Sequence, residues 1–334
     1  MDPLTQGVLG ATLAGALAPK GLKRRALVAG MCGGLAADLD VLIRSEADPL
    51  LSIQYHRHFT HALAFIPIGG FLTAMALMII PWLRRSGWGR LTFFTTLGYA
   101  TSGVIDACTS YGTHLYWPFS DARVAWNTMP IIDPVYTGVL VVFLFFSFKN
   151  RRAVFGLLGL LVGIGYPLLG EWQHRKAEAV IHSVAGERGH SEVSRLTAKP
   201  APLSLLLWRT VYRHEDRYYV DALHVPFLGE SRLYPGASTP ALDFPEDFDA
   251  IPEVSLLYRD LMRFDKFSDG YLYVPEGMKT FVGDLRYAMI PNSLDPLWGV
   301  QWEAGNTDEA VEFITFRDLD KAKRDRFFDM LRGR

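Results

Sequence analysis

The sequence is poor in cysteine, in net charge and, over its first half, in charged residues of any kind. Two cysteines in 334 residues exclude a disulfide-stabilised scaffold. A net charge of −1 gives no electrostatic reason to expect nucleic-acid binding. Hydrophobic residues make up 49% of the chain, which excludes a disordered protein. The first apolar segment also lacks the basic stretch that begins a cleavable signal peptide, so we expect it to be retained as an anchor.

Charged residues divide the chain into two parts. Residues 1–170 hold 21 Asp, Glu, Lys and Arg residues, whereas residues 171–334 hold 48. The first part has 13 basic and 8 acidic residues, and the second has 21 and 27. This contrast is typical of a membrane block followed by a water-exposed domain. We therefore predict a transmembrane domain over 1–172 and an extracytoplasmic domain over 173–334.

The first part contains six apolar segments. A helix needs about 20 mostly apolar residues to cross a bilayer core of roughly 30 Å. The candidates are residues 4–19, 26–43, 59–83, 91–111, 134–148 and 153–170. We therefore predict an α-helical polytopic membrane bundle of about six spans.

Basic residues between these segments predict the orientation of the bundle. Ten of them lie in alternate connections: Lys20, Lys23, Arg24, Arg25, Arg84, Arg85, Arg90, Lys149, Arg151 and Arg152. The other connections hold three: Arg44, Arg57 and Arg123. Because cytoplasmic loops carry the excess of Lys and Arg, we expect residues 173–334 on the outer, periplasmic side of a bacterial inner membrane.

The second part has the pattern of an α+β domain. Aromatic and β-branched runs punctuated by Gly, Pro and Asp predict short strands, at 205–212, 217–220, 270–274, 298–302 and 311–316. Residues 254–263 and 318–332 have helical spacing. We therefore predict a soluble α+β domain with a largely antiparallel sheet.

Ionisable side chains of the first part gather at the predicted outer ends of the spans. They are Asp38, Asp40, His56, His58, His61, Asp106, His114 and Asp133. Ionisable groups at membrane depth are costly and indicate a functional site. A set of carboxylates and imidazoles suits zinc, manganese or iron better than calcium. We therefore predict a divalent-metal site, with zinc favoured and manganese as the alternative.

Spacing constrains how these residues meet. Asp38 and Asp40 are two residues apart and cannot share a helix face, so the chain must turn there if both bind a metal. His58 and His61 are three apart and can share a helical face, whereas His56 must precede the helix that holds His61.

Ordered motifs over residues 1–140 carry a family resemblance. They are MDPLTQ at 1–6, DLD at 38–40, HRHFTH at 56–61, LGY at 97–99 with Asp106, YGTHLYWPFS at 111–120 and IIDPVYT at 131–137. Together they resemble the YdjM family of bacterial inner-membrane proteins, described as membrane-bound metal-dependent hydrolases. The resemblance implies that Asp38, Asp40, His56, His61 and Asp106 are ligands or lie beside ligands.

The sequence departs from the family pattern at three positions. Family members commonly have His where this chain has Ser102, Gly where it has His58, and Gln where it has His114. Either His58, His114 or water would then replace the missing imidazole as a ligand, or the metal site is weakened or altered.

These observations lead to a hypothesis of metal-assisted hydrolysis at the outer membrane surface, on a lipid or lipid-linked phosphoester. Asp40 is predicted as a ligand or bridging carboxylate, Arg57 as a phosphate-neutralising group, and His114 or Asp133 as a general base or orienting residue. Snorkelling to the interface is an equal explanation of Arg57. Two other functions stay open: an ion-coupled transporter, and a non-catalytic envelope scaffold stabilised by a metal.

Overall fold

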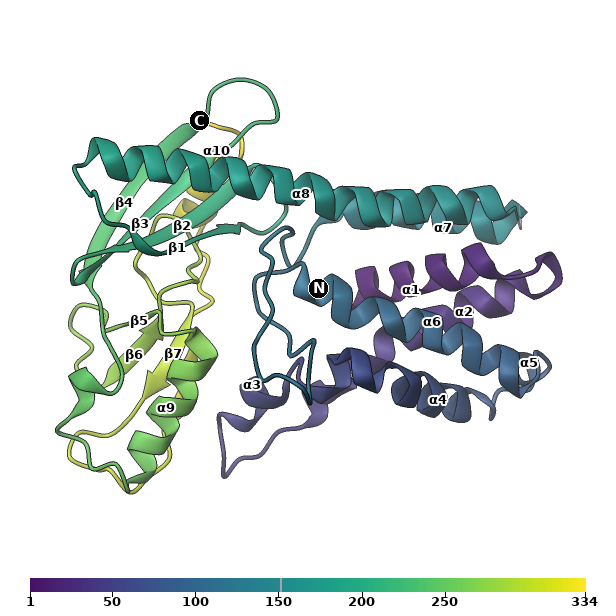
Figure 1. The fold of residues 1–334 in the computed structure, drawn as a ribbon, viewed down its shortest axis with the longest axis horizontal. Coiled ribbons are helices and arrows are strands. Elements are labelled where there is room, and N and C mark those ends of the chain that lie inside the picture. The colour runs from purple at the N-terminus through teal and green to yellow at the C-terminus, as the bar shows by residue number, and fades with distance from the viewer. Residues whose placement is uncertain (151) are drawn as a thin grey trace. The chain divides into compact units, whose positions relative to one another are not determined.

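The computed structural model describes residues 1–150 and 152–334 (Figure 1). Arg151, one of the basic residues used to predict orientation, lies outside the described residues. The chain forms two compact units. The first comprises residues 1–42, 55–172 and 202–204, and the second comprises residues 43–54, 173–201 and 205–334. Residues 43–54 therefore belong to the second unit although they connect two segments of the first.

The first unit is helical. Its α-helices are α1 (Pro3–Leu17), α2 (Lys23–Ala36), α4 (Ile66–Leu77), α5 (Pro81–Arg84), α6 (Trp88–Ala107), α7 (Pro134–Asn150) and the first part of α8 (Ala153–Glu187). Short 3₁₀ helices lie between them: η1 (Lys20–Leu22), η2 (Ala37–Leu42), η3 (Phe59–His61) and η4 (Leu63–Phe65). Helix α1 begins where Asp2 accepts a hydrogen bond from the Thr5 backbone N–H and Pro3 occupies the first turn. These are favourable residues at a helix start.

Helix α1 lies at the centre of this unit, packed against α2, α6 and α7. Gly30 of α2 is the point where three helices meet. A Cβ atom added there would lie 2.5 Å from the carbonyl oxygen of Gly10 in α1, and one added to Gly98 of α6 would lie 2.0 Å from the Gly30 carbonyl oxygen. Only glycine permits this separation, as is common where helices pack in membranes.

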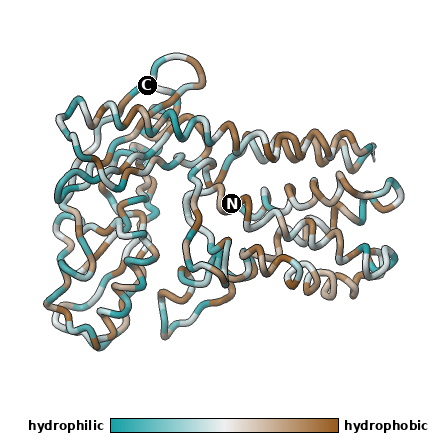
Figure 2. The backbone as a smooth tube through the Cα atoms, viewed as in Figure 1, coloured by the Kyte–Doolittle hydropathy of each residue, from teal (hydrophilic) through white to brown (hydrophobic). Residues whose placement is uncertain are grey.

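The prediction of about six spans is wrong for the described residues. By length and composition, only α8 is able to cross a membrane by itself. Residues 51–61 and 63–77 would form a second span if this pair, bent by 61°, counts as one. Helix α6 has 20 residues but is not apolar enough to count as a span. Four other helices are too short: α1, α2, α4 and α7 have 15, 14, 12 and 17 residues. At 1.5 Å per residue none of these four reaches the roughly 30 Å of a bilayer core. Figure 2 shows hydrophobic residues along these helices.

Apolar side chains remain exposed on α7 and α8. Leu161 and Ile164 of α8 are 68% and 64% exposed, and Val142 and Phe145 of α7 are also exposed. A continuous exposed apolar face on neighbouring turns suits contact with lipid rather than water.

The second unit contains two antiparallel four-stranded sheets, as predicted for an α+β domain. The first has the order β1 (Ser194–Pro200), β2 (Leu207–His214), β3 (Arg217–His224) and β4 (Arg232–Pro240). The second has the order β5 (Leu272–Tyr273), β6 (Phe281–Asp284), β7 (Trp298–Gln301) and β8 (Glu312–Thr315). Helices α9 (Leu256–Ser268) and α10 (Lys321–Leu331), α3 (Leu51–Tyr55) and the 3₁₀ turn η5 (Glu246–Phe248) complete it.

The last turns of α8 supply the core beneath the first sheet. Ala177, Ile181 and Ala185 share one buried face of this helix and pack with Trp208 and Leu223 of the sheet. The sequence predicted a membrane span over 153–170; the helix that contains it continues to Glu187 because this second apolar face follows at helical spacing.

Candidate metal centre

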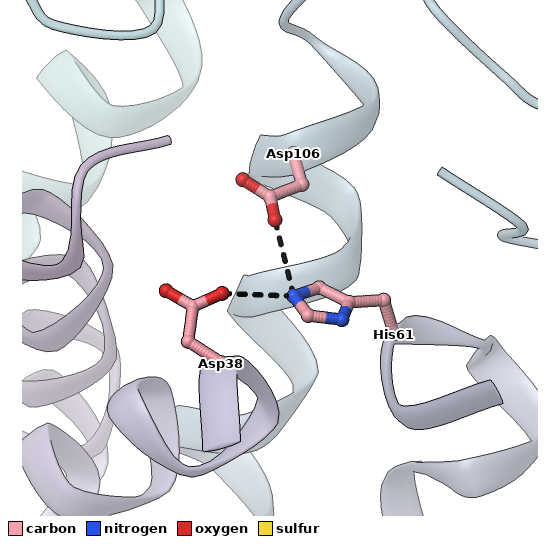
Figure 3. Close-up of side chains that lie close together, drawn as sticks. All are labelled: Asp38, His61 and Asp106. Atoms are coloured by element: carbon pink, nitrogen blue, oxygen red, sulfur yellow. Dashed lines mark hydrogen bonds and ion pairs between the residues drawn. The ribbon is translucent and has the colours of Figure 1, made fainter. Parts of the chain in front are cut away.

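Three side chains from three separate segments converge in the first unit (Figure 3). His61 Nε2 lies 3.2 Å from Asp38 Oδ1 and 3.1 Å from Asp106 Oδ2. One ligand atom from each of the three residues lies within 4.8 Å of the other two. The three residues come from η3, η2 and α6.

Local backbone geometry brings these segments together. Helix α2 ends at Ala36 and continues as the 3₁₀ turn η2, the change of direction that the Asp38–Asp40 spacing required. Opposite it, Gly103 of α6 lies against His61: an added Cβ would be 2.1 Å from the His61 carbonyl oxygen. The missing side chain at Gly103 therefore lets the histidine approach α6 one turn before Asp106.

Asp40 holds the histidine segment from the other side. Its Oδ2 accepts hydrogen bonds from the Arg57 backbone N–H and the Thr60 hydroxyl, both at 2.8 Å, and lies 3.2 Å from His61 Nδ1. Its Oδ1 lies 2.9 Å from His56 Nδ1. A carboxylate on one ring nitrogen of a histidine orients the other nitrogen toward a metal. Asp40 is therefore placed to orient the His61 ring and is not one of the three candidate ligands.

Arg57 lies beside Asp106. Its Nε is 3.2 Å from Asp106 Oδ2, and one terminal nitrogen donates to the Thr109 hydroxyl at 2.8 Å. The side chain is buried, so it does not snorkel to an interface. The guanidinium also lies over the Tyr111 ring, 5.0 Å from its centroid.

The group is accessible from one side. The side chains of His61, Asp40 and Asp106 are 0% exposed, whereas Asp38 is 14% and His56 is 25% exposed. Any molecule that reaches the group must therefore approach along Asp38 and His56.

The donor set fits a divalent cation. Ligand atoms about 2.0–2.2 Å from a tetrahedral zinc ion lie about 3.3–3.6 Å apart, close to the separations of His61 Nε2 from the two carboxylates. Gln6 of α1 donates to both carboxylates, at 3.3 Å to Asp38 and 3.0 Å to Asp106. Its Oε1 is buried with no hydrogen-bond partner among the described residues. The Met1 amino nitrogen also contacts Asp106 Oδ1.

His58 and His114 do not join this group, contrary to the prediction that one of them replaces a missing ligand. Their rings lie against each other, with centroids 4.4 Å apart, and His58 also lies 5.8 Å from the Trp117 ring. The reason is the backbone at His58, whose φ of −90° and ψ of −125° lie outside the helical region. The chain turns there, so His58 and His61 do not share a face.

Asp133 also lies outside the group. Its Oδ1 accepts from the backbone N–H groups of Val135 and Tyr136, both at 3.0 Å, and its Oδ2 accepts from the Tyr166 hydroxyl at 2.6 Å. Asp133 is a cap of helix α7, and this arrangement does not support its predicted role as a general base.

Two residues of the centre were not predicted from the sequence: Gln6 and Thr60. Gln6 was visible as a polar residue inside the first apolar segment, and buried polar groups there require partners. Thr60 gave no signal, because its role depends on a hydroxyl that reaches Asp40 across the turn. The Ser102 hydroxyl donates to the Gly34 carbonyl of α2 at 2.7 Å.

Comparison with known proteins gives one match. The family model described as YdjM inner membrane protein matches residues 1–174, a range that contains every residue of the centre. No curated protein and no solved structure matches the chain.

Proposed function

Because the chain belongs to the YdjM family of inner membrane proteins, we propose that it is a membrane-bound metal-dependent hydrolase with Asp38, His61 and Asp106 as its metal ligands. We further propose a lipid or lipid-linked phosphoester as its substrate. The observation that carries this proposal is the position of His61, whose Nδ1 faces Asp40 while Nε2 faces two other carboxylates. Zinc is the favoured ion and manganese the alternative.

The number of protein ligands favours catalysis over a structural metal. Structural zinc sites have four protein ligands, whereas catalytic sites have three and keep one position open. A bound divalent ion at such a site supplies Lewis-acid polarisation of a phosphoryl oxygen and lowers the pKa of water. The open side would face Asp38 and His56, the two partly exposed side chains.

His56 is the best-placed proton carrier. Asp40 fixes its Nδ1 at 2.9 Å, which leaves Nε2 as the second nitrogen of a partly exposed ring. A histidine held in this way can accept or donate a proton at the substrate. Arg57 pairs with Asp106 and is a buried cation beside the proposed ligands.

The membrane arrangement is part of the proposal. We place the protein as a multi-pass protein of the bacterial inner membrane, with the second unit and the metal centre on the periplasmic side. The excess of Lys and Arg in the opposite connections supports this orientation.

Metal analysis and turnover of matched variants test the proposal. The wild-type protein, purified in detergent, is analysed for metal and assayed on phosphatidic acid, lysophosphatidic acid and a polyprenyl phosphate. The His61→Ala and Asp38→Ala variants should lose both bound metal and hydrolysis. His182→Ala changes an exposed histidine of α8 and should retain both.

Three results would contradict the hydrolase. Hydrolysis retained in His61→Ala would show that the metal centre takes no part in catalysis. Stoichiometric metal without turnover on any of these lipids would favour a structural metal in an envelope scaffold. Metal-dependent ion uptake into proteoliposomes without hydrolysis would favour a transporter.

A further inference from the structure

An apolar groove lies beside the metal centre in the first unit. It has a volume of about 480 Å³, within the range of small-molecule sites. Helices α2, α4 and α6 and the η2 turn supply its walls. Leu35 of α2 and Leu72 and Ala76 of α4 are exposed along it.

Two polar side chains connect the groove to the centre. Thr60 lines the groove and donates its hydroxyl proton to Asp40 at 2.8 Å. Tyr99 lines it as well, and its hydroxyl donates to the Thr60 carbonyl oxygen at 2.7 Å. Leu39, between Asp38 and Asp40, is a third lining residue. The groove therefore ends at the residues that hold and neighbour the candidate ligands.

Gly69 of α4 shapes the wall of the groove. A Cβ atom there would lie 2.2 Å from the Tyr99 ring. The absent side chain lets this ring lie flat against α4, where it forms part of the lining and keeps its hydroxyl at Thr60. The apolar wall and its polar end thus depend on one contact between α4 and α6.

We propose that this groove binds one acyl chain of a phospholipid whose phosphate headgroup reaches the metal centre. This inference rests on the proposed function for the fate of the headgroup. The occupant follows from the chemistry of the groove. Its wall is mostly apolar, it belongs to the unit matched by an inner-membrane family, and its polar end is Thr60, which donates to Asp40 beside His61. The enzyme would then select substrates with a long chain, since each buried methylene adds to binding.

Photocrosslinking tests the occupant. The full-length protein is reconstituted in nanodiscs that contain phosphatidic acid with a diazirine near the end of one acyl chain, and adducts are mapped by mass spectrometry. Adducts should concentrate on residues 32–39 and 66–77. The Ala76→Trp variant should lower their yield by about tenfold, the effect of removing roughly two methylenes from the groove. Met75→Trp, at an exposed neighbour outside the lining, should leave the yield unchanged.

Two comparisons separate this inference from the proposed function. Adducts in the groove should persist in His61→Ala, because the apolar wall does not include the histidine. In the active protein, Ala76→Trp should raise KM about tenfold for a sixteen-carbon lysophosphatidic acid and leave kcat unchanged.

Adducts spread equally over the groove and over Leu161 and Ile164 of α8 would overturn the inference, because they would indicate annular lipid only. A yield insensitive to Ala76→Trp would do the same. Adducts in the groove without any hydrolysis would support acyl-chain binding there and contradict the proposed function.

Discussion

The carboxylates of the two units have different partners. In the second unit, each of three aspartates contacts its own arginine: Asp284 with Arg286 at 2.8 Å, Asp221 with Arg188 at 2.6 Å and Asp243 with Arg213 at 2.6 Å. In the first unit, Asp38, Asp40 and Asp106 gather around His61, and the Arg57 guanidinium and the Met1 amino group both contact Asp106.

The difference separates structural pairs from a cation site. A buried carboxylate with a bidentate arginine is neutralised within the fold. Three carboxylates around one histidine leave negative charge for a divalent ion to neutralise, and removing such a carboxylate should affect metal binding more than folding.

The largest effect on stability is expected from removing one partner of a buried aspartate–arginine pair in the second unit. Arg286→Ala leaves Asp284 buried without its guanidinium, and losing one partner of a buried pair costs about 3–5 kcal/mol. Thermal unfolding in detergent should shift down by about 10 °C, while the metal content of the folded protein stays unchanged. A loss of bound metal in this variant would show that the Asp284–Arg286 pair affects the metal centre, and would contradict separate roles for the carboxylates of the two units.

Removing a carboxylate from the metal centre should give the opposite pattern. Asp38→Asn should weaken zinc affinity by more than about 100-fold, beyond the effect of an orienting residue. The melting temperature of the metal-free protein should stay equal or rise, because repulsion among the carboxylates falls. A melting temperature that drops as far as in Arg286→Ala would contradict a surplus of negative charge.

Asp40→Asn tests the orienting role within the same group. The amide still reaches His61 but no longer holds Nδ1–H as a carboxylate does, so zinc affinity should fall by about 10–100-fold. Competition with a chelator of known affinity measures the change. An effect as large as that of Asp38→Asn would make Asp40 a direct ligand.

A smaller effect is expected from Arg263 of α9. It donates to Asp48 at 2.9 Å and to Gln54 at 2.8 Å, and so fixes residues 43–54, which connect η2 to His56. Exposed pairs contribute up to about 1 kcal/mol, so Arg263→Ala should weaken zinc affinity about fivefold. Arg259→Ala, at an exposed neighbour on the same helix, is the control; equal effects of both would exclude positioning by this contact.

The smallest effect concerns Asp243, whose side chain is 42% exposed. The Arg213 hydrogen bonds hold the pKa of Asp243 below its ordinary value of 3.8. A depressed carboxyl pKa stabilises the fold above the unfolded value, and that stability is lost as the pH falls through the folded value. Arg213→Ala should therefore lower thermal stability by less than about 1 kcal/mol at pH 7. The difference from wild type should shrink as the pH falls below the ordinary Asp pKa of 3.8; a constant difference would exclude the ion pair as its cause.

The sequence predicted the convergence in the first unit better than its details. The spacing of Asp38 and Asp40 required a turn if both were to bind a metal; a 3₁₀ turn is present at η2, although Asp40 lies behind His61. Which histidines face the centre depended on the non-helical backbone at His58, whose ring lies against that of His114. No pattern of residue types predicted this backbone conformation.

The ends of the helices and the position of one strand also could not be predicted from residue types alone. Apolar composition predicted where the helices of the first unit lie, but not that α2 ends at Ala36 or that α4 covers only Ile66–Leu77. Strand β1 was not among the predicted strands, because Ser194–Pro200 has no run of aromatic or β-branched residues and its pairing with β2 makes it a strand. Tertiary contacts decide such segments.

Anomalous scattering from a crystal of the zinc-loaded protein tests the central claim most directly. We expect one peak about 2.0–2.2 Å from His61 Nε2 and from an oxygen of both Asp38 and Asp106. The peak should be absent from Asp38→Asn. Bound zinc without a peak among these three residues, or with its peak between His58 and His114, would contradict the assignment.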